Sequence, residues 1–421
     1  MSLVPLWVSS HAQISSKTGR GLMATRRIEA GDAIVRIAST FLITVATAAD
    51  VLRNEAVNSL NEHCALALFM AKMRFASVQE RGMWHAYVDI TPRDFDTCAA
   101  NLPVELLALL TPEVRLLAQR QVAKMESDYV EASAVISVSK DDFKWGWYSV
   151  NTRCITLSTS MGSNSTKSVP HNPGVRKEPS IALAPFLDLL NHTTNAKIHA
   201  DFNPANNAFE IIALEPVERG SECFIAYGPH DNAFLLAEYG FVVREAEVDA
   251  KLGGDWVHNA YDHVIVDREV LGVAIPGERK GFRELALKEL GDAGLLGDYA
   301  LQMHQDSYRV MNALRLFACS FASPQNFKSD LIRWRMVTQG QLEAVSDENE
   351  QAARVFLREI CSDLLTQTNN ALHAIEAWRL QESKVVEEES TSPSGLSDLK
   401  AMFCTTVYES RFNILTWNLS Q

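Results

Sequence analysis

The sequence lacks the features of a membrane protein or a secreted protein. No apolar run in its 421 residues is long enough to span a bilayer, and residues 1–16 lack the basic segment and apolar stretch typical of a secretory signal. The seven cysteines are odd in number and scattered singly, which favours reduced thiols over a disulfide framework. We therefore expect a chain that stays inside the cell, in cytoplasm, nucleus or both, and does not associate with membranes.

Metal-binding and nucleic-acid-binding patterns are also missing. The eleven histidines form no HExxH motif and the cysteines form no CxxC pair, so we expect no metal site. The formal net charge is −13 and no local basic patch offsets it, which argues against direct nucleic-acid binding. An acidic surface attracts cationic partners, although acidity also serves solubility alone. We expect a monomer.

The patterns that are present predict an α+β fold. β-Branched and aromatic runs indicate strands, and apolar residues three and four apart indicate helices. A helix is expected to begin at Gly228-Pro229, to run for about three turns and to end before Gly240. Strands are expected at residues 33–37, 41–45, 198–202, 208–214 and 222–227, with a hairpin joining the third to the fourth. Helical patterns follow near residues 281–292, 298–320, 328–343, 346–369 and 370–383.

These patterns divide the chain into four parts. Residues 1–47 and 143–243 form the two pieces of a β-rich domain, and residues 48–142 form a helical block inserted between them. Residues 244–421 form a mostly helical domain. Segments 158–180 and 383–397, rich in small, polar and charged residues, are expected to be mobile.

Three segments carry residues suited to binding or catalysis. The first, Gly19-Arg20-Gly21-Leu22-Met23-Ala24, formally matches the glycine-rich dinucleotide-binding pattern. That pattern needs a strand before it and a helix after it, whereas here a polar segment precedes and strands follow. A dinucleotide site is therefore excluded, and a flexible turn remains an alternative.

The second segment is the apolar run Ala184–Leu190, which ends at Asn191 and His192. Asp188, Asn191 and His192 are spaced so that they would share one face of a helical turn. Polar groups beside an apolar wall are typical of a site for a polar ligand. Taken alone, the segment favours a helix end capped by Asn and His over a ligand site.

The third segment places Tyr227 at the end of a strand, with Tyr239 and Phe241 twelve and fourteen residues later. A tyrosine at a strand end is most often part of a core, with its hydroxyl bonded to the backbone. The local sequence leaves a structural role and a binding role open.

In this order the three segments resemble the motifs of the SET domain. Arg153, in Val150-Asn151-Thr152-Arg153, extends the resemblance to the branch related to the Rubisco large-subunit lysine methyltransferase. The resemblance is strong over roughly residues 18–243 and only architectural beyond. It implies a β-rich SET domain with a helical insertion, followed by a helical domain similar to the substrate-binding domain of that branch.

The resemblance also implies an activity, namely transfer of a methyl group from S-adenosyl-L-methionine to a lysine of a histone or another protein. Tyr227 would be the catalytic residue. The implied cofactor-binding residues are Thr18, Gly19, Arg20, Gly21, Leu22, Arg153, Asp188, Asn191, His192 and Tyr227. The implied substrate-binding residues are Ile155, Tyr239 and Phe241.

Two other functions remain open. A relative in the same branch methylates a histidine of actin, and its imidazole site is shaped by an Asn and a Trp where this chain has Cys154-Ile155 and Leu187. That difference favours lysine. The other alternative is a noncatalytic binding module with the same fold, which the joint presence of Asn191, His192 and Tyr227 disfavours.

Overall fold

The computed structural model divides the chain into two compact units. The first comprises Met1–Leu102, Pro112–His230 and Phe234–Gly240, and the second comprises Pro103–Thr111, Asp231–Ala233 and Phe241–Gln421. Thr18, Gly19 and nearly all of the expected mobile loop 158–180 lie outside the described residues. The structure describes residues 6–8, 20–157, 180–244, 246–249, 254–257, 259–275, 281–305, 307–322, 327–389 and 395–420.

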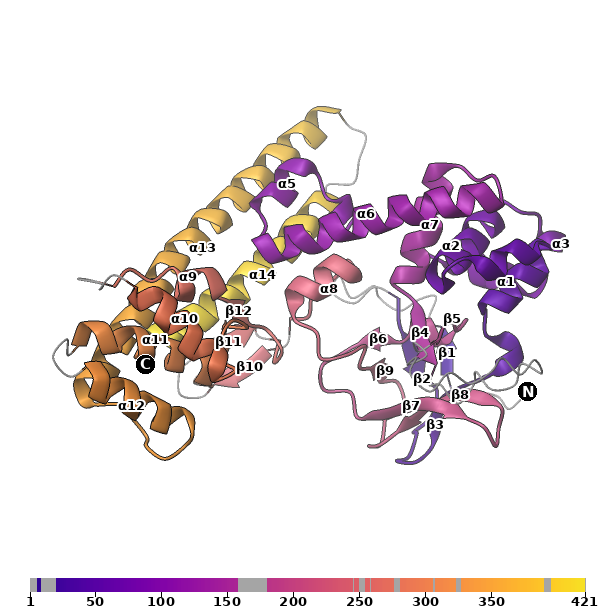
Figure 1. Ribbon diagram of the computed structural model, residues 1–421. Helices are drawn as coiled ribbons and strands as arrows, with labels where there is room; N and C mark the ends of the chain where they lie inside the picture. Colours follow the sequence, from indigo (N-terminus) through magenta and orange to yellow (C-terminus); the bar gives the residue numbers. More distant parts are fainter. Residues whose placement is uncertain are drawn as a thin grey trace. The chain divides into compact units, whose positions relative to one another are not determined.

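Three small sheets form the β part of the first unit (Figure 1). The first has the order β1-β2-β9-β6, the second β3-β8-β7, and the third pairs β4 with β5. Their bounds are β1 Leu6–Val8, β2 Leu22–Ala24, β3 Ala33–Ala38, β4 Cys154–Leu157, β5 Ser180–Leu183, β6 Asn191–His192, β7 Ile198–Asn203, β8 Ala208–Ala213 and β9 Glu222–Ile225.

Strand β9 brings three distant parts of the sequence together. It runs antiparallel to β2, with Leu22 opposite Cys223, and parallel to β6, with His192 opposite Ile225. Neighbouring strands lie roughly 5 Å apart. The glycine segment, the Asn191-His192 pair and the strand that leads to Tyr227 are therefore side by side.

The expected hairpin is confirmed, because β7 and β8 pair antiparallel from Ile198 opposite Ala213 to Asn203 opposite Ala208. The strand expected at residues 41–45 is wrong. Only Ile43 pairs there, through an isolated bridge to Leu183, and the hydroxyl of Thr44 caps the helix that begins at Val45. A helix N-cap takes precedence over β propensity at this position.

Helices occupy most of the chain between β3 and β4, and one of them, α5 (Val104–Leu109), belongs to the second unit. Helices α2 and α7 pack closely at Gly146, where an added Cβ would lie 2.3 Å from the carbonyl oxygen of Ala67. Glycine is therefore required for the two helices to approach.

The helices between β3 and β4 have the bounds η1 Ser39–Phe41, α1 Val45–Leu52, η2 Glu55–Ser59, α2 Glu62–Met73, α3 Val78–Arg81, η3 Gly82–Trp84, α4 His85–Ile90, η4 Ala99–Asn101, α5 Val104–Leu109, α6 Pro112–Val135 and α7 Lys140–Asn151.

Two short helices follow in the second half of the β-rich region, η6 Leu187–Leu189 and α8 Asn232–Glu238. The expected start of α8 at Gly228-Pro229 is wrong, because the backbone N–H of His230 donates to the carbonyl oxygen of Gly228 in a separate turn. The helix is correspondingly shorter than three turns. Its expected end is confirmed, since Gly240 follows it with a φ of 75°, a conformation that favours glycine.

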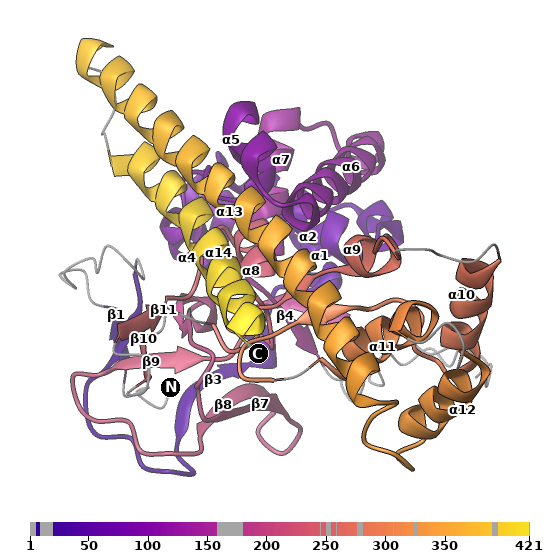
Figure 2. The ribbon, with the colours of Figure 1, turned by 90° about the vertical axis from the view of Figure 1, so that its left-hand side faces the viewer.

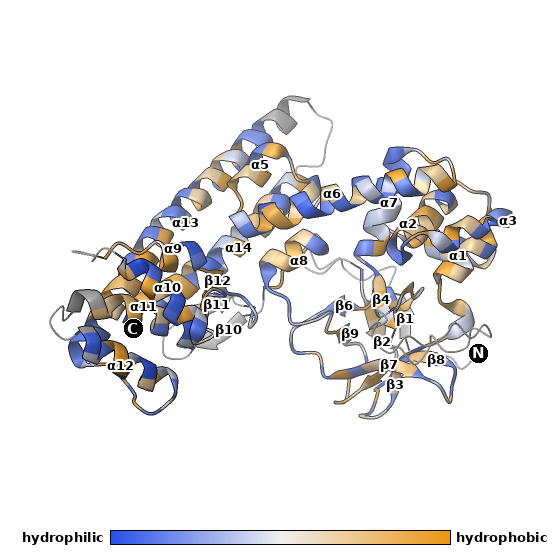
Figure 3. Ribbon diagram, in the orientation of Figure 1, coloured by the Kyte–Doolittle hydropathy of each residue, from blue (hydrophilic) through white to orange (hydrophobic). Residues whose placement is uncertain are grey.

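The second unit is mostly helical. The helices α13 and α14 lie side by side in both views (Figures 1 and 2). Hydrophobic and hydrophilic residues alternate along α13, as a helix with one buried face requires (Figure 3). The bounds are α9 Asp267–Leu271, α10 Phe282–Asp292, α11 Tyr308–Ala322, α12 Phe327–Thr338, α13 Asp347–Glu389 and α14 Gly395–Ser420, with strands β10 Ala246–Asp249, β11 Gly254–Val257, β12 Val264–Ile265 and β13 Ala300–Leu301.

Three sequence predictions in this unit differ from the structure. The helix expected near 298–320 begins only at Tyr308, after the strand β13 at Ala300–Leu301. The helices expected at 346–369 and 370–383 are one helix, because neither Gly nor Pro occurs between residues 347 and 389 to end it. The segment 383–397 was expected to be mobile, but residues 383–389 belong to α13 and residues 395–397 begin α14; residues 390–394 lie outside the described residues. Helix α14 itself was not expected.

The α+β fold class is confirmed. The first unit holds one apolar core among its helices and one among its strands, and the second unit holds a third. Among the described residues, no helix combines the length and the apolarity that crossing a membrane requires.

Candidate active site

Asn191 and His192 lie on β6 and their side chains point to opposite faces. The helical turn expected to align Asp188, Asn191 and His192 is therefore wrong, because the 3₁₀ turn η6 ends at Leu189 and β6 then pairs with β9. Successive side chains of a strand alternate in direction. One segment thus contributes Asn191 to the glycine side and His192 to the tyrosine side.

The amide of Asn191 connects the glycine segment to β9. Its Nδ2 donates to the carbonyl oxygen of Arg20 at 3.2 Å and to Oε1 of Glu222 at 2.6 Å. A Cβ on Gly21 would lie 2.0 Å from that same Glu222 oxygen and 2.8 Å from Nδ2 of Asn191. Gly21 therefore leaves room for this pair of side chains.

Tyr227 is fixed by two hydrogen bonds. Its hydroxyl donates to the carbonyl oxygen of Leu190 at 2.8 Å, and its backbone N–H donates to Nδ1 of His192 at 3.0 Å. Because Nδ1 accepts, the His192 ring carries no proton there. Burial raises the pKa of the Tyr227 phenol above its usual value, so the hydroxyl remains protonated at neutral pH.

Aromatic rings continue outward from Tyr227. The ring centroids of His192 and Tyr239 each lie 5.1 Å from that of Tyr227. The ring centroid of His230 lies 6.3 Å from that of Tyr239, and the His230 ring stacks on the Phe234 ring with 4.2 Å between their centroids. Burial raises the pKa of Tyr239 to about 12, so this row is neutral at its tyrosines and presents ring faces suited to a cation.

A buried ionic group stands beside Tyr227. The Nε atom of Arg153 lies 3.6 Å from Oδ2 of Asp188, whose side chain is 2% exposed, and the hydroxyl of Tyr87 donates to the same oxygen at 2.8 Å. Burial raises the pKa of Asp188 to about 6, while Arg153 and Tyr87 act in the opposite direction. The guanidinium also lies over the ring of Phe95, 5.7 Å from its centroid.

The remaining predicted site residues differ in how they are placed. Leu22 is fully buried in the strand core, and Ile155 on β4 packs against that core while half-buried. Phe241 belongs to the second unit. Thr18 and Gly19 lie outside the described residues.

Three groups of the site were missed from the sequence: Tyr87, Glu222 and Phe95. Glu222 is recognisable only once the pairing of β2 with β9 places it opposite Met23. Tyr87 is 101 residues from Asp188, on a helix of the insertion, and no local pattern marks it. Phe95 lies in a short connection of the same insertion and carries no motif.

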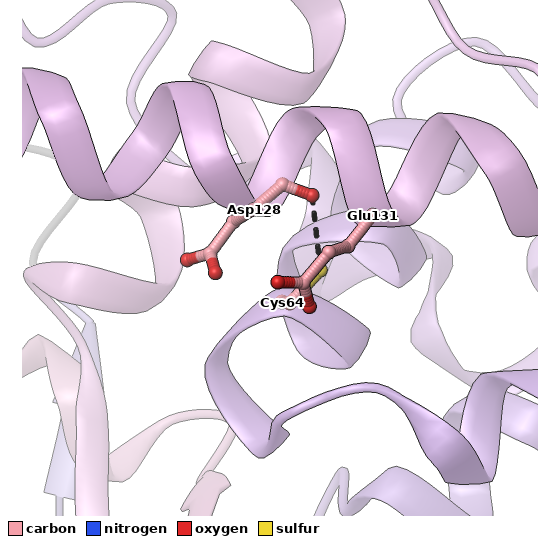
Figure 4. A group of neighbouring side chains, drawn as sticks. All are labelled: Cys64, Asp128 and Glu131. Carbon is pink, nitrogen blue, oxygen red and sulfur yellow. Dashed lines mark hydrogen bonds between the residues drawn. The ribbon is translucent and has the colours of Figure 1, made fainter.

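One group of possible metal ligands occurs among the described residues, namely Cys64, Asp128 and Glu131 (Figure 4). The Asp128 carboxylate already accepts hydrogen bonds from Asn61 and Lys124 on Oδ1 and from Trp147 on Oδ2. The Cys64 thiol donates to the carbonyl oxygen of Asp128 at 3.2 Å, and burial raises its pKa to about 12. Since metals bind the thiolate, we assign the group to the packing of α2 against α6.

The chain is similar to known proteins over most of its length. SET domain-containing protein 4 of Mus musculus is 28% identical over 417 residues, which cover 90% of this chain and 86% of the relative. Ribosomal lysine N-methyltransferase set11 of Schizosaccharomyces pombe is 26% identical, and the match covers 69% of this chain and 67% of the relative. Actin-histidine N-methyltransferase of Danio rerio is 25% identical and covers 80% of this chain and 55% of the relative.

The fold has solved counterparts. The crystal structure of the SET domain of LSMT bound to lysine and AdoHcy matches with a TM-score of 0.57 at 16% identity, covering all of this chain and 87% of that chain. The family model of the SET domain matches residues 19–228, which include the β2-β9-β6 arrangement and Tyr227. The chain therefore contains a SET domain and belongs to the SET-domain methyltransferase family.

Proposed function

We propose that the chain transfers a methyl group from S-adenosylmethionine to a lysine side chain of a protein substrate. The observation that carries the proposal is the pairing of β2, β9 and β6, which unites Gly21, Asn191 and Tyr227 at one site. Each of these residues alone has a structural explanation, but their convergence in a SET domain does not follow from packing alone.

The residues present fit the cofactor. A guanidinium such as that of Arg153 suits a carboxylate, the Asn191 amide suits polar groups, and Gly21 leaves the backbone open to close approach. We therefore propose that these three residues, with Arg20 and His192, hold S-adenosylmethionine. When bound, this cofactor supplies an electrophilic methyl group on a sulfonium.

The tyrosines suit a lysine nucleophile. A free lysine has a pKa of about 10.4 and is almost fully protonated at neutral pH, whereas a water-poor aromatic surrounding favours the neutral amine. The protonated hydroxyl of Tyr227, held by the Leu190 carbonyl oxygen, can orient the amine, and the ring faces of Tyr227 and Tyr239 stabilise positive charge. The chain's main contribution to the reaction is to align the lysine amine with the methyl group of the cofactor.

The relatives include both a lysine and a histidine methyltransferase, so the acceptor requires its own test. The chain is incubated with S-adenosylmethionine carrying a tritiated methyl group and a total protein extract, and the labelled protein is hydrolysed to amino acids. Label in methyllysine is expected. Label in methylhistidine supports the alternative acceptor, and tight cofactor binding without transfer supports a noncatalytic module.

A matched pair of variants controls this assay. Tyr227→Phe should abolish most of the label. Tyr261→Phe, which alters an exposed tyrosine in the second unit, should leave the label unchanged.

A further inference from the structure

Helix α4 of the insertion touches two parts of the site at once. Near its middle, the hydroxyl of Tyr87 donates to Oδ2 of Asp188 at 2.8 Å. At its end, the carbonyl oxygen of Ile90 accepts from Nη2 of Arg20 at 2.6 Å. A helix of the insertion is thereby joined to the glycine segment and to the segment before β6.

Asp188 is badly suited to contact the cofactor directly. Its carboxylate would repel the carboxylate of S-adenosylmethionine, and its side chain is 2% exposed and already lies against Tyr87 and Arg153. A buried carboxylate next to a guanidinium instead restricts where that guanidinium lies. The action of Asp188 is therefore exerted on Arg153.

Arg153 is held from three directions. Asp188 faces its Nε, the hydroxyl of Thr152 accepts from its Nη1 at 2.6 Å, and the ring of Phe95 lies under its Cζ. The guanidinium has five N–H donors, so these contacts leave donors for an anionic ligand. Its side chain is 18% exposed, which keeps part of the group accessible.

We propose that Tyr87 and Asp188 are positioning residues that hold the Arg153 guanidinium in place for the carboxylate of the cofactor. This inference rests on the proposed function. It assigns to helix α4 a part in cofactor binding, because Tyr87 on this helix holds Arg153, which lies 66 residues later in the sequence.

The expected consequence is selective for the amino-acid part of the ligand. Removing the Tyr87 hydroxyl leaves the buried Asp188 with one donor fewer, so the carboxylate and the arginine shift together. S-Adenosylhomocysteine should bind about 10-fold more weakly to Tyr87→Phe, as expected for one lost bond to a charged group. 5′-Methylthioadenosine, which lacks the amino and carboxyl groups, should bind as it does to the wild type.

The test is calorimetry of both ligands with the full-length chain. Tyr148→Phe is the matched control, because it removes a hydroxyl from another buried tyrosine of the same apolar core. In an Arg153→Lys background, the Tyr87→Phe substitution should have little further effect, because its target is already altered. Asp188→Asn gives a second route, with the same selective loss, and thermal melting verifies that each variant is folded.

The outcomes separate the two proposals. Wild-type chain that fails to bind S-adenosylhomocysteine overturns the proposed function and this inference with it. Wild-type binding, with equal affinity in Tyr87→Phe, overturns the inference alone. Equal losses for both ligands, or full additivity with Arg153→Lys, also overturn it, since either result indicates a general structural effect.

Discussion

The hydroxyl of Tyr227 donates a hydrogen bond to the carbonyl oxygen of Leu190 across 2.8 Å, although the two residues are 37 positions apart in the sequence. Leu190 directly precedes β6 and Tyr227 follows β9, so in this parallel pair the tyrosine side chain reaches back from beyond the end of β9 to the start of β6. The same bond fixes the direction of the phenol oxygen. Tyr227 is consequently held by the strands that also position Asn191.

Tyr227→Phe should separate binding from chemistry. The substitution removes an oxygen and almost no volume, so S-adenosylhomocysteine affinity should stay within about twofold, while methyl transfer should fall at least about 100-fold, as for other lost orienting donors. Single-turnover transfer at saturating cofactor measures this. Transfer at the wild-type rate would remove Tyr227 from the catalytic role.

Asn191→Ala should weaken cofactor binding by at least about 10-fold, because it removes the donor to Arg20 and leaves the Glu222 carboxylate without that partner. Asn206→Ala is a matched control, since it removes an asparagine that donates to Glu210 in the β7–β8 hairpin. Calorimetry with S-adenosylhomocysteine is the measurement. Equal affinities of the two variants would argue against the role of Asn191.

Gly21→Ala should displace the Asn191–Glu222 pair. The new Cβ would lie 2.0 Å from a Glu222 oxygen, which is the end of a flexible side chain, so the chain should fold but bind cofactor more weakly by roughly 10-fold or more. Gly291→Ala adds the same methyl group where nothing lies within 4 Å. If Gly21→Ala binds like Gly291→Ala, the glycine is not needed for the site.

Gly146→Ala should lower stability rather than affinity. Its Cβ would meet the backbone of α2, at Ala67 and Ala71, and backbone cannot move as a side chain can. Overpacking of this kind costs about 1–3 kcal/mol in the free energy of unfolding. Urea denaturation against wild type measures it, and an unchanged midpoint would mean that α2 and α7 separate without cost.

The pKa of Asp188 predicts a pH dependence of binding. With a pKa of about 6, the carboxyl becomes protonated below that pH and loses its attraction for Arg153. Tyr87, whose hydroxyl donates to Asp188, titrates far above this range because burial raises its pKa. Affinity for S-adenosylhomocysteine should therefore fall from pH 7.5 to 5.5 in the wild type and change less in Asp188→Asn. Parallel profiles would contradict this.

The same shift has an opposite effect on folding. The pKa of Asp188 is higher in the folded chain than the usual value of about 3.9, so the protonated form favours the folded state. Its contribution to stability is full below about pH 4 and is lost as the pH rises through 6. The difference in unfolding free energy between wild type and Asp188→Asn should follow this course. Asp262 also has a pKa of about 6, but it is present in both proteins, so its contribution to the unfolding free energy cancels in the difference.

The sequence predicts the elements with a clear period well and the short or long-range features poorly. The β7–β8 hairpin and the helical insertion follow from alternation and helical spacing, which act locally. Residues 188–192 are too few for a period to decide between helix and strand, and only the pairing with β9 decides it. The Tyr87–Asp188 contact spans 101 residues, so it depends on tertiary packing that no local pattern encodes.

A crystal structure of the chain with S-adenosylhomocysteine tests the proposed function most directly. We predict ligand density in contact with Gly21, Arg153 and Asn191, on the same site as Tyr227, in agreement with the convergence of β2, β9 and β6. Density at another place, or no density at saturating ligand in crystals with an open site, would contradict the assignment of these residues to the cofactor.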